Sequence, residues 1–135
     1  MDRKKLDELI AQIETYLECW KQFNQYLGMA RNKKFDQEHE SQFLEMKSVL
    51  AQQLEVILAA VETSALNRDE VYELVGAAPS LRFLSEQNES MHRNLEDQWH
   101  KIYIAWQSIL GQLKVQQQKQ EPKSFWGGLF GGGKR

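Results

Sequence analysis

Glu89 and His92 are the residues of this chain whose types and spacing come closest to metal or catalytic chemistry. Side chains three residues apart on a helix share a face, and di-metal carboxylate bundles bind their ions through a Glu-x-x-His spacing. Such a centre also needs a second copy of the motif and two further inward glutamates, whereas this sequence holds one copy. We therefore expect Glu89 and His92 to form a boundary ion pair, with no metal and no cofactor. A metal-binding bundle of the ferritin or oxidase type is the alternative.

Two other groups of side chains invite a chemical interpretation. Trp99 and His100 are adjacent, and a histidine can serve a proton-transfer or ligand site. However, Trp99 and Trp106 have the spacing of core residues, so we expect them to pack against aromatic residues of the first helix and His100 to be exposed. No helix N-terminus lies near Cys19 to lower its pKa, so we expect no nucleophile there. The sequence thus favours a protein that is not an enzyme, and it leaves open whether a ligand binds near Trp99 and Trp106.

The last eleven residues, FWGGLFGGGKR, combine four large apolar side chains with five glycines. Glycine loses more backbone entropy on ordering than any other residue, so this segment is not expected to hold a structure alone in water. If the segment becomes helical on a surface, Phe125 lies four residues from Leu129 and Trp126 lies four residues from Phe130. All four side chains then share one face. This pattern predicts a docking segment.

Lys134 and Arg135 follow those four side chains. Aromatic side chains beside cations suit an anionic bilayer surface, and the same residues suit a hydrophobic groove on a protein. The sequence leaves both surfaces open. The end GGLFGGGKR is similar to the short carboxy-terminal cargo-loading tags that tether proteins inside bacterial protein shells, in which an apolar residue and glycines precede a basic terminus. That resemblance implies attachment to a shell and assigns no role to individual residues.

The charge of the chain argues against a nucleic-acid partner. Seventeen basic and nineteen acidic side chains leave a formal net charge of -2, without the basic excess that phosphate binding requires. Arg31, Lys33 and Lys34 form a small basic corner, which we expect to be a solvated loop.

The sequence also suggests a cellular location. Cys19 is the one cysteine, which fits a reducing compartment. The start, MDRKKLDELI, lacks the continuous apolar segment of a secretory signal, and no run of about eighteen apolar residues would span a membrane. We expect a cytoplasmic protein, peripheral to a membrane or inside a protein shell.

Apolar periodicity predicts three long helices and one short one. The inward stripe of the first consists of Leu6, Leu9, Ile13, Tyr16, Trp20, Phe23 and Leu27, and that of the second consists of Phe43, Met46, Leu50, Leu54, Ile57 and Val61. Asp36, Asn67 and Ser80 are residue types that begin helices well. The last predicted helix carries an inward stripe from Leu81 to Leu113 that includes Asn88 and Met91. The predicted segments are 2–29, 36–63, 67–76 and 79–116.

We therefore predict an all-α fold, in which three long, coiled-coil-like helices form an antiparallel bundle with one short extra helix and a flexible Gly-rich C-terminal tail. The bundle covers residues 1–117, and the linker and apolar tail cover 118–135. The function that this organisation favours is a helical adaptor or scaffold. Its body would engage a protein partner, and a homo-oligomer is left open.

Overall fold

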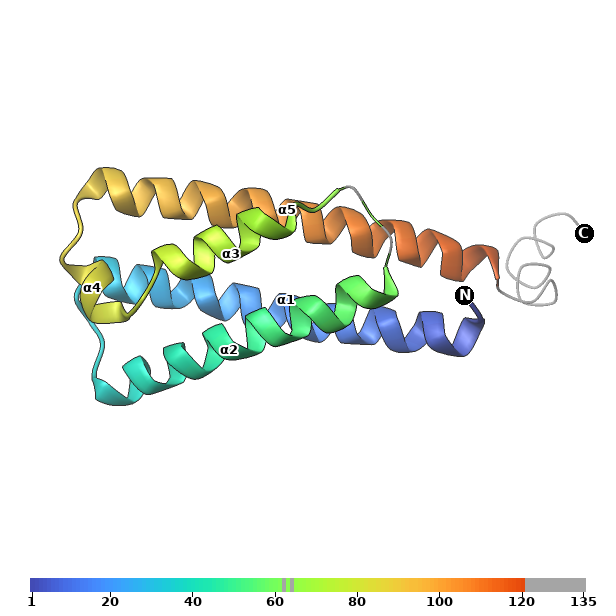
Figure 1. Cartoon of the computed structure of the whole chain (residues 1–135), viewed down its shortest axis with the longest axis horizontal. Coiled ribbons are helices and arrows are strands. Elements are labelled where there is room, and N and C mark those ends of the chain that lie inside the picture. The colour runs from blue at the N-terminus through green and yellow to red at the C-terminus, as the bar shows by residue number, and fades with distance from the viewer. Residues whose placement is uncertain (62, 64, 121–135) are drawn as a thin grey trace, which may run out of the picture.

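The computed structural model describes residues 1–61, 63 and 65–120 of the chain. These residues form helices and loops and contain no strand (Figure 1), so the all-α prediction is confirmed. The helices are α1 (Arg3–Arg31), α2 (Gln37–Ala60), α3 (Arg68–Ala77), α4 (Leu81–Ser85) and α5 (Glu89–Lys119).

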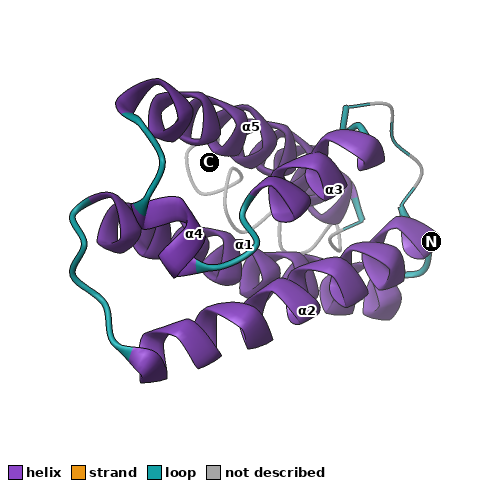
Figure 2. Ribbon diagram, turned by 60° about the vertical axis from the view of Figure 1, so that its left-hand side comes forward, coloured by secondary structure: helices purple, strands orange, loops and turns teal. Residues whose placement is uncertain are grey.

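The long helix α1 is the centre of the fold. It contacts α5, α2 and α4, while α3 contacts α5 and α2. Helix α1 runs antiparallel to both α2 and α5 (Figure 1), because α3 and α4 carry the chain back along the bundle before α5 begins. Together α3 and α4 lie between α2 and α5 (Figure 2) and fill the position of a fourth helix. Three consecutive antiparallel helices would instead leave the first and last parallel. The short helix predicted at 67–76 corresponds to α3, but the prediction contained no separate α4 and no return of the chain along the bundle.

The segment that was predicted as one helix from Pro79 onward is two helices. The Ser80 hydroxyl accepts a hydrogen bond from the backbone N–H of Phe83 at 3.0 Å and begins α4. After a short break, the side chain of Asn88 accepts from the backbone N–H of Met91 at 2.8 Å and begins α5. Asparagine is among the best N-cap residues because its side chain satisfies an otherwise unpaired backbone donor. The prediction that Asn88 lies inside an apolar stripe was therefore wrong.

Helices α2 and α3 begin at the capping residues that the sequence predicted. Asp36 caps α2 by accepting from the backbone N–H of His39 at 2.9 Å, and the His39 imidazole accepts from the backbone N–H of Asp36. That backbone hydrogen bond from His39 lowers the pKa of the Asp36 carboxyl. Asn67 caps α3 as predicted, through the backbone N–H of Asp69.

Helix α1 ends in a motif that usually contains glycine. The backbone N–H of Lys34 donates to Met29 and that of Lys33 donates to Ala30, which is the hydrogen-bond pattern of a Schellman C-cap. Lys33 takes the left-handed conformation that the motif requires, with φ of 58°. Because a side chain makes this conformation costly, the end of α1 stores some strain.

The core follows the predicted stripes most closely along α1. All seven residues of the stripe predicted there are buried: Leu6, Leu9, Ile13, Tyr16, Trp20, Phe23 and Leu27. In α2, Phe43, Leu50, Leu54 and Ile57 are buried, whereas Met46 and Val61, also predicted to face inward, are only partly buried. Among the residues described, no helix has both the length and the apolar character that crossing a membrane requires.

Candidate functional site

The residues predicted to make the attachment lie outside the described part of the chain. They are Phe125, Trp126, Leu129, Phe130, Lys134 and Arg135. What the structure describes is the place from which this segment starts. Helix α5 ends beside the N-terminus, at the end of the bundle away from α4 (Figure 1).

Three exposed hydrogen bonds hold this terminal end together. The Gln120 side chain donates to the backbone carbonyl of Met1 at 3.1 Å, and the guanidinium of Arg3 donates to the Gln120 carbonyl at 3.3 Å. The Gln117 amide donates to the Asp7 carboxylate at 2.8 Å. Residues that follow Gln120 therefore start from the end of the bundle where the N-terminus lies.

Glu89 and His92 do not share one environment. The Glu89 carboxylate pairs with the guanidinium of Arg31, which also pairs with Glu96 at 2.6 Å. The side chain of His92 is buried, with 6% of its surface exposed, so the prediction that it lies at the boundary of the core was wrong. Because α5 begins only at Glu89, its inward stripe starts at His92 and continues at Leu95, with the alternating spacing of a heptad.

The surroundings of Glu89 suit an ion pair better than a metal. Arg31 contacts two of the nearby carboxylates, and its positive charge would oppose a cation in the same place. Arg93 adds a second cation, with a nitrogen 3.9 Å from the Glu89 carboxylate. Within the residues that the structure describes, no group of three or more His, Cys, Asp or Glu side chains is placed to hold a metal ion.

The tryptophans and tyrosines form packing contacts between α1 and α5. Trp20 and Trp106 are completely buried, and the ring of Tyr16 lies edge-on to both, with its centroid 5.1 Å from that of Trp106. The Trp99 indole donates to the backbone carbonyl of Trp20 at 2.7 Å. His100 is exposed, as predicted. The aromatic residues thus join α1 to α5.

The buried polar groups of this aromatic cluster are only partly satisfied. The Tyr16 hydroxyl donates to the backbone carbonyl of Leu50 at 2.7 Å, and burial raises the pKa of Tyr16 well above its usual range. The indole nitrogens of Trp20 and Trp106 are buried without a hydrogen-bond partner in the described part of the protein. An unpaired buried donor costs about 1–3 kcal/mol, which the packing of two large aromatic side chains offsets.

Cys19 lies on α1, partly buried. Burial, and to a lesser extent the neighbouring Glu18 carboxylate, raise the pKa of its thiol. Because the thiolate is the nucleophilic form, this environment makes Cys19 a poor nucleophile at neutral pH.

The cations near the end of α1 either contact other parts of the fold or lie exposed. Arg31 pairs with Glu89 and Glu96, as described above. Lys33 and Lys34 are exposed. The Lys47 ammonium lies 6.0 Å from the centre of the Phe43 ring and 3.5 Å from the carbonyl of Pro79, and burial lowers its pKa. These contacts bind parts of the fold to one another.

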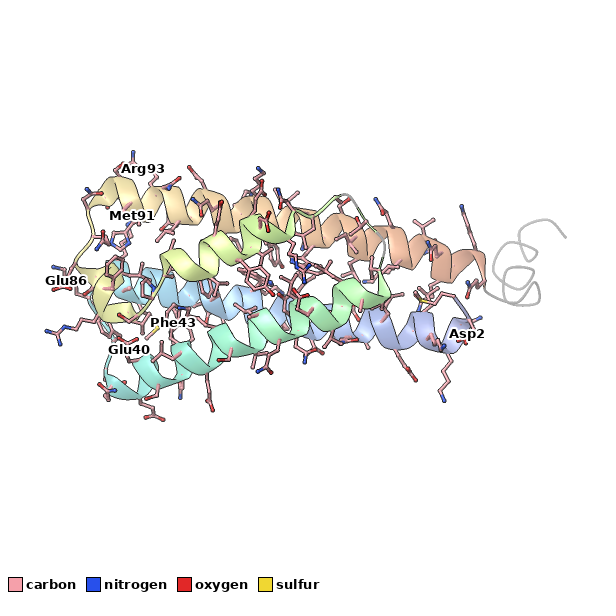
Figure 3. All side chains as sticks on the ribbon, in the orientation of Figure 1. Asp2, Glu40, Phe43, Glu86, Met91 and Arg93 are labelled. Carbon is pink, nitrogen blue, oxygen red and sulfur yellow. The ribbon has the colours of Figure 1, made fainter. Side chains whose placement is uncertain are left out.

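Glu40 is a structural residue that the sequence did not reveal. Its carboxylate accepts hydrogen bonds from the backbone N–H groups of Leu81 at 2.8 Å and Arg82 at 3.1 Å. The carboxylate of α2 thereby satisfies the first donors of α4, near the end of the bundle shown at the left of Figure 3. Such an acceptor can be anywhere in the sequence, so no local pattern marks Glu40.

Glu55 joins α2 to α3 through similar hydrogen bonds. Its carboxylate accepts from the Tyr72 hydroxyl at 2.6 Å and from Nε of Arg68 at 3.0 Å. These contacts are exposed and hold the short helix α3 against α2.

The described surface is hollowed along the grooves between helices. One hollow of about 410 Å³ lies between α1 and α5 and has polar walls that include Glu14, Glu18 and Lys21. Two others, of about 400 and 390 Å³, lie along the groove between α1 and α2. None of these hollows brings together the few convergent polar groups and apolar walls of a typical small-molecule site.

Comparisons of the chain with protein-family models, with curated proteins and with solved structures gave no match.

Proposed function

We propose that the chain is a non-enzymatic helical adaptor, in which the bundle is the body and the residues from Phe125 onward attach it to a membrane surface or a larger protein assembly. The observation that carries this proposal is the position of Gln120, which lies beside Met1 at the end of the bundle opposite α4. A segment that follows Gln120 can therefore reach a surface without crossing the body.

The energetics favour weak, reversible attachment. Burying four large apolar side chains contributes about 6–12 kcal/mol. Ordering eleven residues costs at least about 1 kcal/mol each. Because these two amounts nearly cancel, one tail on its own holds only loosely, and several tails acting together hold more firmly.

The contacts of Glu89 give little support to a metal-binding function. Arg31 pairs with Glu89, and a carboxylate that already neutralises an arginine is a poor ligand for a cation. For this reason we do not propose the metal-binding alternative. Attachment to a surface agrees with a cytoplasmic protein that is peripheral to a membrane or held inside a protein shell.

The test replaces Trp126 and Phe130 together with alanine in the full chain. We expect this double variant to lose sedimentation with liposomes or co-purification with an assembly. Its matched control replaces Ile104 and Val115 with alanine, because these two side chains are apolar and lie exposed on α5. The control should bind like the wild type.

The same assay distinguishes the two surfaces. Binding to a bilayer should rise when anionic lipid is added, since Lys134 and Arg135 are cationic. Binding to a protein groove should depend on shape and hardly on lipid charge. If the double variant binds as fully as the wild type, the tail is passive and the proposal is wrong.

A further inference from the structure

The charged side chains of this protein are divided unevenly between its two termini and its body. Residues 1–5 and 119–135 together contain seven Lys or Arg and two Asp or Glu, whereas residues 6–118 contain ten and seventeen. The two parts thus have formal net charges of +5 and -7, within a chain of net charge -2. The structure brings residues 1–5 and 119–120 to the same end of the bundle (Figure 1). A charge asymmetry of this kind indicates a charged surface as partner.

Four basic side chains lie at this end of the bundle. They are Arg3, Lys4 and Lys5 in the first turn of α1 and Lys119 in the last turn of α5, and all four are exposed. The guanidinium of Arg3 donates to the carbonyl of Gln120, so the two helices meet here. Successive residues of a helix point ~100° apart, so the three cations of α1 lie on different sides of it. We call these four residues the basic end.

The cations of α1 are in an unfavourable place for the stability of the helix. The N-terminus of a helix carries a partial positive charge, so acidic side chains stabilise the first turn and basic ones do not. Helices α2, α3 and α5 follow this rule, with Asp or Glu in each first turn. Helix α1 has no acidic residue in its first turn and has three basic ones. Folding does not explain these side chains, and a local rule broken without a gain in stability points to a function.

The acidic side chains nearby do not cancel the basic end at its outermost turn. Asp2 caps α1 and accepts from the backbone N–H of Lys5 at 2.8 Å. Asp7 and Glu8 lie one turn further into the bundle, and Asp7 accepts from the Gln117 amide at 2.8 Å. One helical turn is ~5.4 Å, and the Debye length is ~8 Å at physiological ionic strength. A flat surface at this end is therefore attracted most strongly by the cations, while charges two or more turns away are largely screened.

An anionic bilayer is the partner that this arrangement fits. Each basic residue beside an anionic leaflet strengthens binding about fivefold, within about a Debye length of the surface. Because a bilayer is flat and extended, it can contact cations on different sides of α1 and on α5 at once. A hydrophobic groove could take the tail without any of them. A side-on approach would bring the acidic body, with its net charge of -7, to the membrane and would be repelled.

The basic end also compensates for the weakness of the tail. The apolar side chains of the tail gain little more on burial than the ordering of the segment costs. A single weak hydrophobic anchor gives marginal membrane binding, and stable attachment takes a second signal such as a polybasic patch. The basic end lies where the chain continues into the tail, so both signals can reach the same surface.

We propose that Arg3, Lys4, Lys5 and Lys119 bind the headgroups of an anionic bilayer, so that the bundle stands end-on with α4 directed away from the membrane. Insertion of the tail beside them rests on the proposed function, whereas the contact of the basic end with the headgroups does not. The end-on orientation leaves the far end and the sides of the bundle accessible to a protein partner.

The first test measures binding of the full chain to phosphatidylcholine vesicles with and without phosphatidylserine. The variant Lys4→Gln, Lys5→Gln should weaken binding to the anionic vesicles about tenfold or more. Its matched control is Lys33→Gln, Lys34→Gln, which removes two adjacent, exposed lysines from the opposite end of the bundle and should bind like the wild type. If the Lys4→Gln, Lys5→Gln variant binds anionic vesicles as tightly as the wild type does, the inference is wrong.

Thermal unfolding of the same variants shows whether the lysines serve the fold instead. Lys4→Gln, Lys5→Gln removes two cations from the positive end of α1, so its melting temperature should equal or exceed that of the wild type. A lower melting temperature would mean that these side chains support the helix, and it would overturn the argument that folding does not explain them.

Lysine modification tests the end-on orientation. An amine-reactive reagent should label Lys4, Lys5 and Lys119 much less on anionic vesicles than in free protein. Lys33 and Lys34 should be labelled equally in both conditions, because they lie at the end directed away from the membrane. Equal protection at the two ends would overturn the end-on orientation.

The outcomes separate this inference from the function of the tail. A wild-type chain that binds a protein assembly but no anionic vesicle would overturn the inference and leave the tail proposal standing. The converse result comes from the Trp126→Ala, Phe130→Ala variant. If it binds anionic vesicles as fully as the wild type does while Lys4→Gln, Lys5→Gln does not, the basic end binds by itself and the tail proposal is wrong.

Discussion

The two ends of the bundle are held by different kinds of contact. At the end where α1 turns into α2 and α4 precedes α5, charged side chains cross between elements: Arg31 pairs with Glu89 and Glu96, Glu40 accepts from the first backbone donors of α4, and Lys47 donates to the carbonyl of Pro79. At the terminal end, Gln117 bonds to Asp7, and the nearby Lys114 pairs with an exposed carboxylate of α1 at 3.2 Å.

The difference lies in what each contact must satisfy. Glu40 accepts from a partly buried backbone donor at Leu81, and leaving such a donor unpaired is costly. The contacts at the terminal end are exposed, and exposed polar contacts contribute little because water replaces them. The contacts at the loop end should therefore contribute more to the free energy of unfolding than those at the terminal end. A substitution at the terminal end should cost the fold little. That tolerance suits the end from which we propose that the attachment segment continues.

The largest effect should come from the core between the two ends. Leu54→Ala removes a completely buried side chain and should lower the free energy of unfolding by about 2–5 kcal/mol, as measured by chemical denaturation. Val56→Ala is the control on the same helix, because Val56 is 51% exposed. Equal losses in both variants would mean that α2 does not face the core as described.

Glu40 tests the loop end directly. Glu40→Ala leaves the first N–H groups of α4 without their acceptor and should cost about 1–3 kcal/mol, measured in the same denaturation experiment. Glu45→Ala removes an exposed carboxylate from the same helix and should cost less than about 0.5 kcal/mol. If the two variants are equally stable, the loop end is held no more tightly than the terminal end.

At the loop end, a substitution of Lys33 should raise the stability of the protein and not lower it. Lys33→Gly should stabilise the protein by about 0.5–1 kcal/mol, because glycine adopts the positive φ of this position without steric cost. Asn32→Gly is the control, since Asn32 has an ordinary helical φ of -87° and should gain nothing. The melting temperatures of both variants would measure the difference, and a loss at Lys33 would contradict the described end of α1.

The smallest effect should come from the terminal end. Truncation after Gln118 removes the bonds between Gln120 and the N-terminus along with the tail. We expect helical content to be unchanged and the melting temperature to fall by less than about 5 °C, which corresponds to roughly 1 kcal/mol for a chain of this size. A larger fall would show that residues beyond Gln118 pack on the bundle, and the contrast between the two ends would disappear.

Burial on α5 also corrects one expectation about stability. In the predicted boundary ion pair of Glu89 and His92, a substitution at either position would cost little. The burial of His92 now separates them. The residues predicted for attachment, from Phe125 to Arg135, lie outside the described part of the chain, so their role is still a prediction.

The sequence by itself determined the helical class, the inward stripe of α1 and the caps at Asp36 and Asn67. These features depend on residues a few positions apart, through helical periodicity and through side chains that bond the nearest backbone donors. A single sequence contains all of that information, because the interacting groups are neighbours along the chain.

Only the tertiary structure decided that α3 and α4 return the chain between α2 and α5, that His92 is buried, and that Arg31 and Glu40 hold the loop end. Arg31 is 65 residues from Glu96, and Glu40 is 41 residues from Leu81. Which charged side chain meets which distant partner depends on how whole helices are placed against one another. That placement results from the packing of the entire core, and no short segment of the sequence contains it.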